Sequence, residues 1–103
     1  MINYGAAIRR VRSELGIKQT EIARRTGLTA SFLSLVENGK AVPSLSTLKE
    51  IGKAMDIPYE LLAWEAIDPP ESLNIEQKQT IFLAKSVTSD FLRNLKNRRE
   101  KSK

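Results

Sequence analysis

The side chains that enzymes use most often for catalysis are missing from this sequence of 103 residues. It has no histidine and no cysteine, so the usual general base, the thiolate nucleophile and the commonest nitrogen and sulfur metal ligands are absent. Catalysis would need paired carboxylates or a lysine nucleophile, but the acidic residues are scattered, and Glu60 and Glu65 are unlikely partners at a spacing of five. We therefore expect no enzyme, no metal and no cofactor.

Positive charge is concentrated at the two ends of the sequence. Residues 1–53 hold nine bases and four acids, residues 54–70 hold four acids and no base, and residues 71–103 hold eight bases and four acids. The net charge of +5 is therefore arranged as a basic front, an acidic middle and a basic tail. This distribution favours a protein that turns one face toward a polyanion, although ordinary surface solubility would also account for the charge alone.

Two short helical patterns meet at Gly27, a residue that can adopt the positive φ of a tight turn. Ala23, four residues earlier, is small and lets a second helix cross close to the first. Thr29 stands at the N-cap position of that second helix, where a hydroxyl satisfies a free backbone N–H. Leu33 and Val36 are three residues apart and share its inner face. This is the pattern of a helix-turn-helix.

With these residues the chain resembles the lambda-repressor-like helix-turn-helix proteins, the Cro/CI-type or XRE family of bacterial and phage regulators. The resemblance covers about residues 4–64 and rests on four segments in the family's order and spacing: Gln19–Ala23, Gly27–Thr29, Leu33–Lys40 and Pro43–Leu48. It implies an all-α fold, with a five-helix DNA-binding domain, and a double-stranded DNA partner. Lys18 departs from the pattern, because the family often has a serine cap there.

The resemblance also implies roles for individual residues. Base contacts fall on the outward face of the second helix, at Ala30, Ser31, Ser34 and Leu35. Backbone phosphate contacts fall on Gln19, Asn38 and Lys40. Apart from the resemblance, Lys18 is a predicted phosphate contact because its cation could reach a phosphate, and the weaker candidates are Arg9, Arg10, Arg24 and Arg25. Arg12 and Glu37 correspond to an ion pair that joins the first helix to the third. Since the base-contacting face lacks Arg, Gln and Asn, we expect modest direct readout helped by DNA shape.

The predicted domain organisation has three parts. Residues 1–67 form the helix-turn-helix domain, with helices at about 3–15, 19–26 and 30–37, a fourth after Ser44 and a fifth from Ile57-Pro58. The buried face of the fourth helix should contain Leu45, Leu48, Ile51, Gly52 and Met55. Residues 68–73 are a proline-containing linker. Residues 74–103 form a long C-terminal helix, opened by a capping box at Asn74 and Gln77 and ending in a basic tail.

The C-terminal helix carries an apolar stripe that is too large to leave in water on a lone helix. We expect it to form a homodimer, as suits two half-sites of a palindromic operator, through Ile81, Leu83, Val87, Phe91 and Leu95. Two alternatives stay open. The helix could fold back on its own domain, or it could bind a different protein.

The predicted function is a sequence-specific DNA-binding regulator of transcription that represses by occupying its operator. Two other classes remain possible: an antitoxin-type regulator that binds both DNA and a toxin, and a protein-interaction module that keeps the fold but reads no sequence. No segment has the pattern of a signal peptide or a membrane span, so we expect a cytoplasmic location and no membrane partner.

Overall fold

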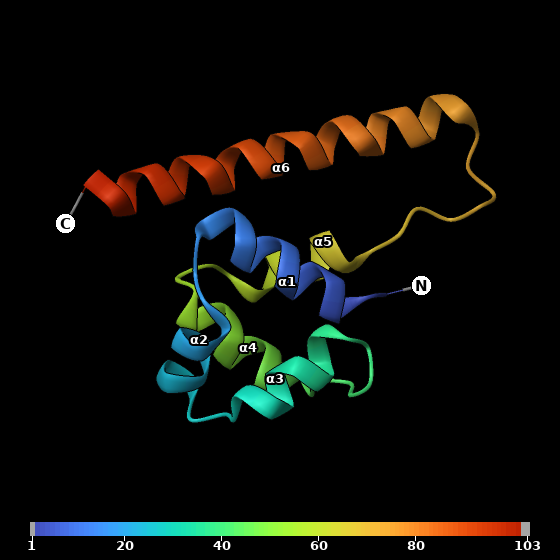
Figure 1. Cartoon of the computed structure of the whole chain (residues 1–103). Helices are drawn as coiled ribbons and strands as arrows, with labels where there is room; N and C mark the ends of the chain where they lie inside the picture. The colour runs from blue at the N-terminus through green and yellow to red at the C-terminus, as the bar shows by residue number, and fades with distance from the viewer. Residues whose placement is uncertain (1, 102–103) are drawn as a thin grey trace.

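The computed structural model describes residues 2–101, with side chains described as far as residue 98, and its regular structure is helical. Six helices follow one another along the chain: α1 (Tyr4–Leu15), α2 (Gln19–Thr26), α3 (Ala30–Glu37), α4 (Leu45–Ala54), α5 (Tyr59–Ala66) and α6 (Ile75–Lys101). An isolated antiparallel bridge between Ile2 and Ile67 brings the N-terminal segment next to the end of α5. The all-α fold, with five short helices and a long one after them, is confirmed (Figure 1).

Side-chain caps explain where several helices begin. Asn3, Thr29 and Ser44 accept hydrogen bonds from backbone N–H groups in the first turns of α1, α3 and α4, at 3.1, 3.0 and 3.1 Å. At the start of α6, Asn74 Oδ1 accepts from Gln77 N at 2.8 Å while Gln77 Oε1 accepts from Asn74 N at 3.0 Å. The starts predicted from Thr29, Ser44 and the capping box of α6 are therefore confirmed.

The hydrophobic core lies between the short helices and includes one residue of α6. Its largest fully buried side chains are Ile8, Val11, Ile22, Leu33, Val36, Ile51, Met55, Leu62 and Leu92. Leu45 was predicted to belong to this core, and that prediction is wrong, because Leu45 is 56% exposed. Leu45 is the first residue of α4, and the helix buries its apolar face only from Leu48 onward.

The crossing of α1 over the end of α3 depends on Gly5. A Cβ atom at this position would lie 2.1 Å from the carbonyl oxygen of Val36 and 3.2 Å from that of Glu37. Both obstacles are backbone atoms, which cannot move aside as a flexible side chain would. Glycine therefore lets α1 come close enough to α3 for polar side chains of the two helices to meet.

Helix α6 runs across α1, on the opposite side of the domain from α3 (Figure 1). Leu92 is buried in the shared core, and Leu95 is half-buried against it. Trp64 of α5 donates an indole N–H to the hydroxyl of Thr88 at 3.2 Å. The inner face of α6 thus packs on its own chain, which is the fold-back arrangement that competed with the dimer in the sequence-based interpretation.

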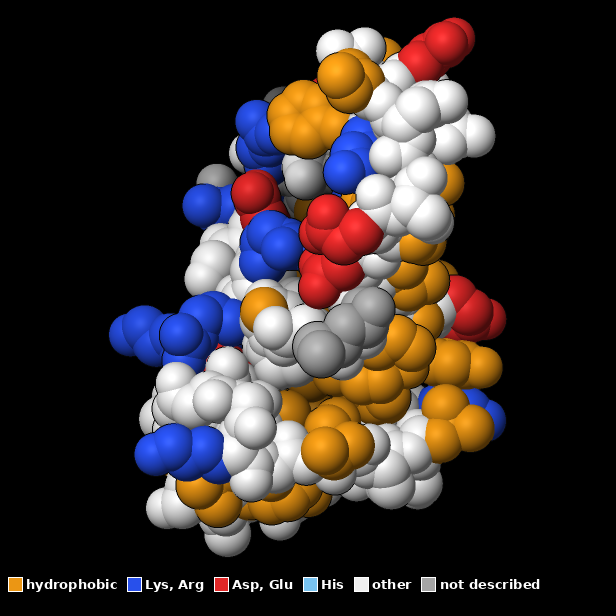
Figure 2. All heavy atoms as spheres, turned by 90° about the vertical axis from the view of Figure 1, so that its right-hand side faces the viewer, with side chains coloured by type: hydrophobic (Ala, Val, Ile, Leu, Met, Phe, Trp, Pro, Cys, Tyr) orange, Lys and Arg blue, Asp and Glu red, His pale blue; other side chains and the backbone are white. Residues whose placement is uncertain are grey.

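The predicted dimerisation stripe is divided between two faces of α6. Leu95 contacts the core of its own chain and Ile81 is half-buried, so neither lies fully on an outer surface. The other three members, Leu83, Val87 and Phe91, are exposed. In Figure 2, which looks from the side where α6 begins, hydrophobic side chains reach the surface both near α6 and lower on the domain. The division of the chain into 1–67, 68–73 and 74–103 stays a prediction, and the end of the basic tail lies outside the described residues.

Candidate nucleic-acid interface

The geometry of α3 turns one face into the core and the other to the surface. Leu33 and Val36 are almost completely buried against the other helices. Gly27 ends α2 with φ of 79°, and Thr26 stabilises the turn, because its hydroxyl donates to the carbonyl of Ile22 at 2.8 Å and accepts from Leu28 N at 3.1 Å. The turn fixes the angle at which α3 leaves α2, so the outer face of α3 is held by a rigid support.

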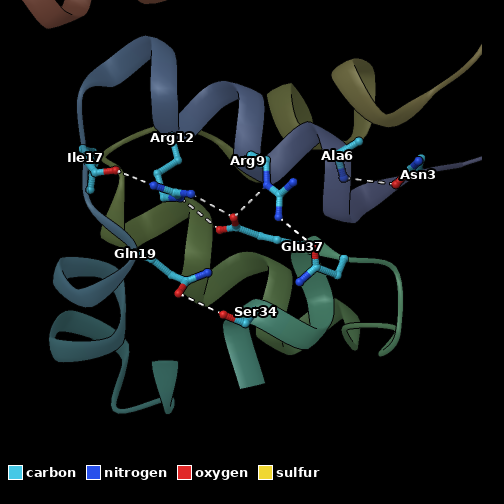
Figure 3. A network of polar contacts seen from close by, with 9 residues as sticks. Asn3, Ala6, Arg9, Arg12, Ile17, Gln19, Ser34 and Glu37 are labelled. Carbon is cyan, nitrogen blue, oxygen red and sulfur yellow. Dashed lines mark hydrogen bonds and ion pairs between the residues drawn. The ribbon is translucent and has the colours of Figure 1, made fainter. Parts of the chain in front are cut away.

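The four residues predicted to contact bases lie on the outer half of α3 but differ in exposure. Ala30 and Ser31 are exposed, and Leu35 is 45% exposed although it is a large apolar residue. Ser34 is half-buried, and its hydroxyl donates to Oε1 of Gln19 at 3.1 Å (Figure 3). The structure thus joins a predicted base-contact residue to a predicted phosphate-contact residue, across the two helices of the motif.

Gln19 and Lys18 stand together at the start of α2. Lys18 occupies the N-cap position, makes no side-chain cap and is exposed. Gln19 is the first residue of α2 and is half-buried beside Ser34. Because the side-chain oxygen of Gln19 accepts from Ser34, its NH₂ group is the end that can donate to a ligand.

Asn38 and Lys40 follow the end of α3 and are both exposed. The chain turns between them at Gly39, which has φ of 74°. Oδ1 of Asn38 accepts from Arg9 at 2.9 Å, so this side chain also keeps its NH₂ group for donation. The backbone N–H of Lys40 donates to the carbonyl of Leu35 at 2.8 Å, which ties the loop to α3.

A network of arginines surrounds Glu37 at the end of α3 (Figure 3). Arg12 binds both carboxylate oxygens, with Nε 3.0 Å from Oε2 and Nη2 2.9 Å from Oε1, and a further Arg12 nitrogen donates to the carbonyl of Ile17 at 3.2 Å. Arg9 contacts Oε1 at 3.4 Å. The Glu37 side chain is almost completely buried, so these bonds compensate a charge that has lost its water.

Arg9 was predicted only as a weak phosphate candidate, and its place in the network was missed. Arg10, which lies next to it, pairs instead with Glu65, at 2.6 Å. The other weak candidates also form ion pairs within the chain: Arg25 lies 2.7 Å and Arg24 3.8 Å from the carboxylate of Glu21. The helical spacing that puts Arg9 on the Arg12 side of α1 is the one signal that could have indicated its role.

Neither a cluster of metal ligands nor a membrane-spanning helix occurs among the described residues. No group of three or more acidic side chains within residues 2–98 is placed to hold a metal ion. Among the helices that the structure describes, none combines the length and the apolar character that a membrane span needs.

Together, the turn at Gly27, the buried and exposed faces of α3 and its five-helix surroundings define a helix-turn-helix protein. The family model described as Helix-turn-helix matches residues 8–62 of the chain. The match covers more than half of the 103 residues, so the chain belongs to this family, in its XRE-type branch.

Several curated proteins are similar to the chain over about two thirds of its length. It is 36% identical over 67 residues to the HTH-type transcriptional repressor RghR of Bacillus subtilis, covering 64% of this chain and 50% of RghR. It is also 36% identical over 67 residues to the ImmF control region 10 kDa protein of Bacillus phage phi105, covering 65% of this chain and 74% of that protein. The chain thus spans half the length of RghR and about three quarters of the phage protein.

A solved structure supports the same assignment. The restriction-modification controller protein C.AhdI from Aeromonas hydrophila is 30% identical, with a TM-score of 0.56, over 59% of this chain and 92% of that chain. The likeness therefore takes in almost the whole of C.AhdI but leaves about two fifths of this chain outside it.

Proposed function

We propose that this protein is a sequence-specific DNA-binding regulator of transcription, and that it acts as a repressor by occupying its operator. The observation that carries the proposal is the exposed face of α3, which is held rigidly by the turn at Gly27 and flanked by Lys18 and Lys40. A short helix presented in this way fits the major groove. The names of RghR and of the Immunity repressor protein of phage phi105, which is 31% identical over 64 residues, support the same direction of control.

Each predicted contact has a specific chemistry in this proposal. Ala30 and Leu35 pack on thymine methyl groups, and Ser31 bonds a base edge. Ser34 has two tasks, because its hydroxyl donates to Gln19 and can still accept from a base. The small size of these side chains brings α3 close to the floor of the groove, so the shape of the DNA contributes to specificity.

The phosphate contacts come from both ends of the motif. Gln19 and Asn38 each have a side-chain oxygen occupied by a donor of their own chain, Ser34 and Arg9, so both present NH₂ groups to phosphate oxygens. Lys18 and Lys40 add positive charge on either side. In this proposal the Arg12–Glu37 pair is structural, because it holds the end of α3 against α1 and contributes no DNA contact.

The proposed protein acts in the cytoplasm as a homodimer on a palindromic operator, with half-sites about 34 Å apart. It needs no metal or cofactor and carries out no catalysis in this proposal. In this proposal the homodimer forms through the exposed part of α6, at Leu83, Val87 and Phe91. A toxin or another protein that binds this surface would place it among antitoxin-type regulators.

The proposal is tested by selecting bound DNA from a random pool and measuring retardation of the selected sequence at increasing salt. Lys40→Ala should weaken binding to all DNA and reduce the salt slope by about one, because a phosphate contact carries no sequence. Leu35→Ala should change the preferred sequence, with a discrimination change of about 1–3 kcal/mol per altered base pair. Lys78→Ala is the matched control, because Lys78 lies on α6, across the domain from α3.

Three outcomes would contradict the proposal. Absence of any retarded complex at low salt would indicate a protein-interaction module. A selected sequence that Leu35→Ala leaves unchanged would remove α3 from the base-reading role. Equal losses for Lys40→Ala and Lys78→Ala would show that general charge alone accounts for the binding.

A further inference from the structure

The exposed flank of α6 carries three large apolar side chains at a regular spacing. Leu83, Val87 and Phe91 follow one another at intervals of four residues and are 65%, 69% and 48% exposed. Residues four apart lie one above the other on a helix, so the three form one continuous ridge, here called the outer ridge. Hydrophobic contact of the ridge with another surface would remove it from water.

The outer ridge winds from the side of α6 opposite the core toward one flank, because Leu83 is about 180° around the helix from Leu92. Each residue of an α-helix is turned about 100° from the one before it, so Val87 is about 140° around the helix from Leu92. Leu92 points into the core, and Phe91 is turned away from it by only about 100°. The ridge is therefore tilted to one flank. Phe82, also exposed, lies on the other flank beside Arg10, Lys85 and Ser86.

The residues on either side of Val87 match one another in kind. Leu83 and Phe91, four residues before and after it, are both large and apolar. Thr80 and Asn94, seven residues away on each side, are both neutral and polar. Glu76 and Arg98, eleven residues away, have opposite charges. An antiparallel copy centred on Val87 would place each member of these pairs opposite the other, with acid facing base at both ends.

We infer that the outer ridge packs against the α6 helix of a second copy of this chain. The two helices are antiparallel, and Val87 lies on the two-fold axis. Leu83 of each copy then packs against Phe91 of the other, and the two Val87 side chains meet at the centre. This inference rests on the proposed dimeric regulator and specifies its interface. A two-fold interface of this kind is self-complementary, as the symmetric pattern around Val87 requires.

The antiparallel arrangement also keeps the two proposed DNA-binding faces on one side of the helix pair. The two-fold axis that relates antiparallel helices runs perpendicular to both of them, so the bodies packed beneath the tilted helices stay on the same side of the pair. Since α3 lies across the domain from α6 (Figure 1), the two α3 helices then lie on the same side of the helix pair, although their outer faces are splayed apart. In a parallel pair the axis would run along the helices and turn the two α3 faces in opposite directions, away from a shared DNA duplex.

Single cysteine variants test this geometry, because the natural chain has no cysteine. Val87→Cys should form an intermolecular disulfide under mild oxidation, since the two Val87 positions meet at the axis. Leu83→Cys and Phe91→Cys should each fail to link with themselves, because identical positions would be about 12 Å apart along the helices. An equimolar mixture of Leu83→Cys and Phe91→Cys should link the two variants to each other. Phe82→Cys, on the opposite flank, is the matched control.

Disulfide formation by Leu83→Cys or Phe91→Cys alone, as readily as by Val87→Cys, would indicate parallel helices and overturn the inference. So would light scattering at the monomer mass of 11.6 kDa at micromolar concentration. A dimer that does not form a disulfide through Val87→Cys would place the interface elsewhere, and the proposed regulator would stand without this inference. Disulfide formation through Val87→Cys in a protein that retards no DNA would support the interface and contradict the proposed regulator.

Discussion

Two buried glutamates pack against α1 from different helices, and their surroundings differ. Glu37, from α3, has both carboxylate oxygens bonded by arginines, at 2.9 and 3.0 Å from Arg12 and 3.4 Å from Arg9. Glu65, from α5, has Oε2 bonded by Arg10 at 2.6 Å. Its Oε1 is buried with no hydrogen-bond partner among the described residues.

The difference shows which of two helix contacts has the more specific geometry: the contact of α1 with α3 or that of α1 with α5, here called the α1–α3 and α1–α5 joints. A buried carboxylate favours a single arrangement only when hydrogen-bond donors surround it. Each oxygen without a donor lowers the stability of the fold, because it has lost its hydrogen bonds to water and gained none in return. The α1–α3 joint combines a fully bonded carboxylate with the close backbone approach at Gly5. The α1–α5 joint has a partly bonded carboxylate, and Glu65 lines a surface pocket together with Arg10 and Lys85. The stronger joint is the one that fixes the proposed DNA-reading helix.

The largest effect is expected from Gly5→Ala, which should lower the free energy of unfolding by about 3 kcal/mol. The new methyl group would overlap the carbonyl oxygen of Val36, so α1 and α3 would have to move apart. Chemical denaturation measures the change, and Ser13→Ala, at an exposed position of α1, is the control. A Gly5→Ala variant as stable as the control would show that the two helices do not approach as described.

Arg12→Ala should lower the free energy of unfolding by about 2–3 kcal/mol, because it leaves the buried Glu37 carboxylate with Arg9 alone. DNA affinity, compared at matched folded fraction, should change much less. Thermal melting and a retardation assay on the same samples give both quantities. An unchanged melting temperature with lost DNA binding would instead make Arg12 a phosphate ligand.

Glu37→Gln and Glu65→Gln compare the two joints directly. Glu37→Gln should cost about 1–2 kcal/mol, since an amide NH₂ cannot accept from the arginine that now bonds that oxygen. Glu65→Gln should cost less than about 1 kcal/mol, because an unpartnered oxygen is available to become the NH₂ group. Denaturation curves of the two variants, measured side by side, decide the matter. Equal losses would remove the distinction between the joints.

The smallest effect is expected from Arg9→Ala, at less than about 1 kcal/mol. The Arg9 side chain is 53% exposed, against 19% for Arg12, so water already screens most of its interaction with Glu37. Replacing Arg9 would also remove the hydrogen bond that its side chain donates to Asn38. A double-mutant cycle of Arg9→Ala with Arg12→Ala measures how far the two arginines support each other. A loss for Arg9→Ala as large as that for Arg12→Ala would contradict this ranking.

The helix-turn-helix itself could be predicted closely from the residues. The bounds of α2 and α3 agree with the sequence-based prediction because Gly27 and Thr29 act within a few residues of their own positions. Leu45 was misplaced because apolar spacing defines a face of a helix but cannot show where the neighbouring helices stop covering it.

The C-terminal helix shows a second limit of sequence-based prediction. One apolar stripe was expected to serve one surface, yet Leu92 and Leu95 pack on the chain's own core while Leu83 and Val87 stay outside. A stripe this wide can serve two surfaces, and the boundary between them depends on how α6 lies across α1.

By itself, the sequence determined the features that depend on near neighbours: the caps at Thr29, Ser44 and Asn74, and the inner and outer faces of α3. A cap joins residues three apart, so it forms wherever the local residues allow it. Only the tertiary structure decided the partners of the arginines of α1. Their bonds span 25 residues from Arg12 to Glu37 and 55 from Arg10 to Glu65. Such bonds depend on the relative positions of whole helices, which the packing of the core sets.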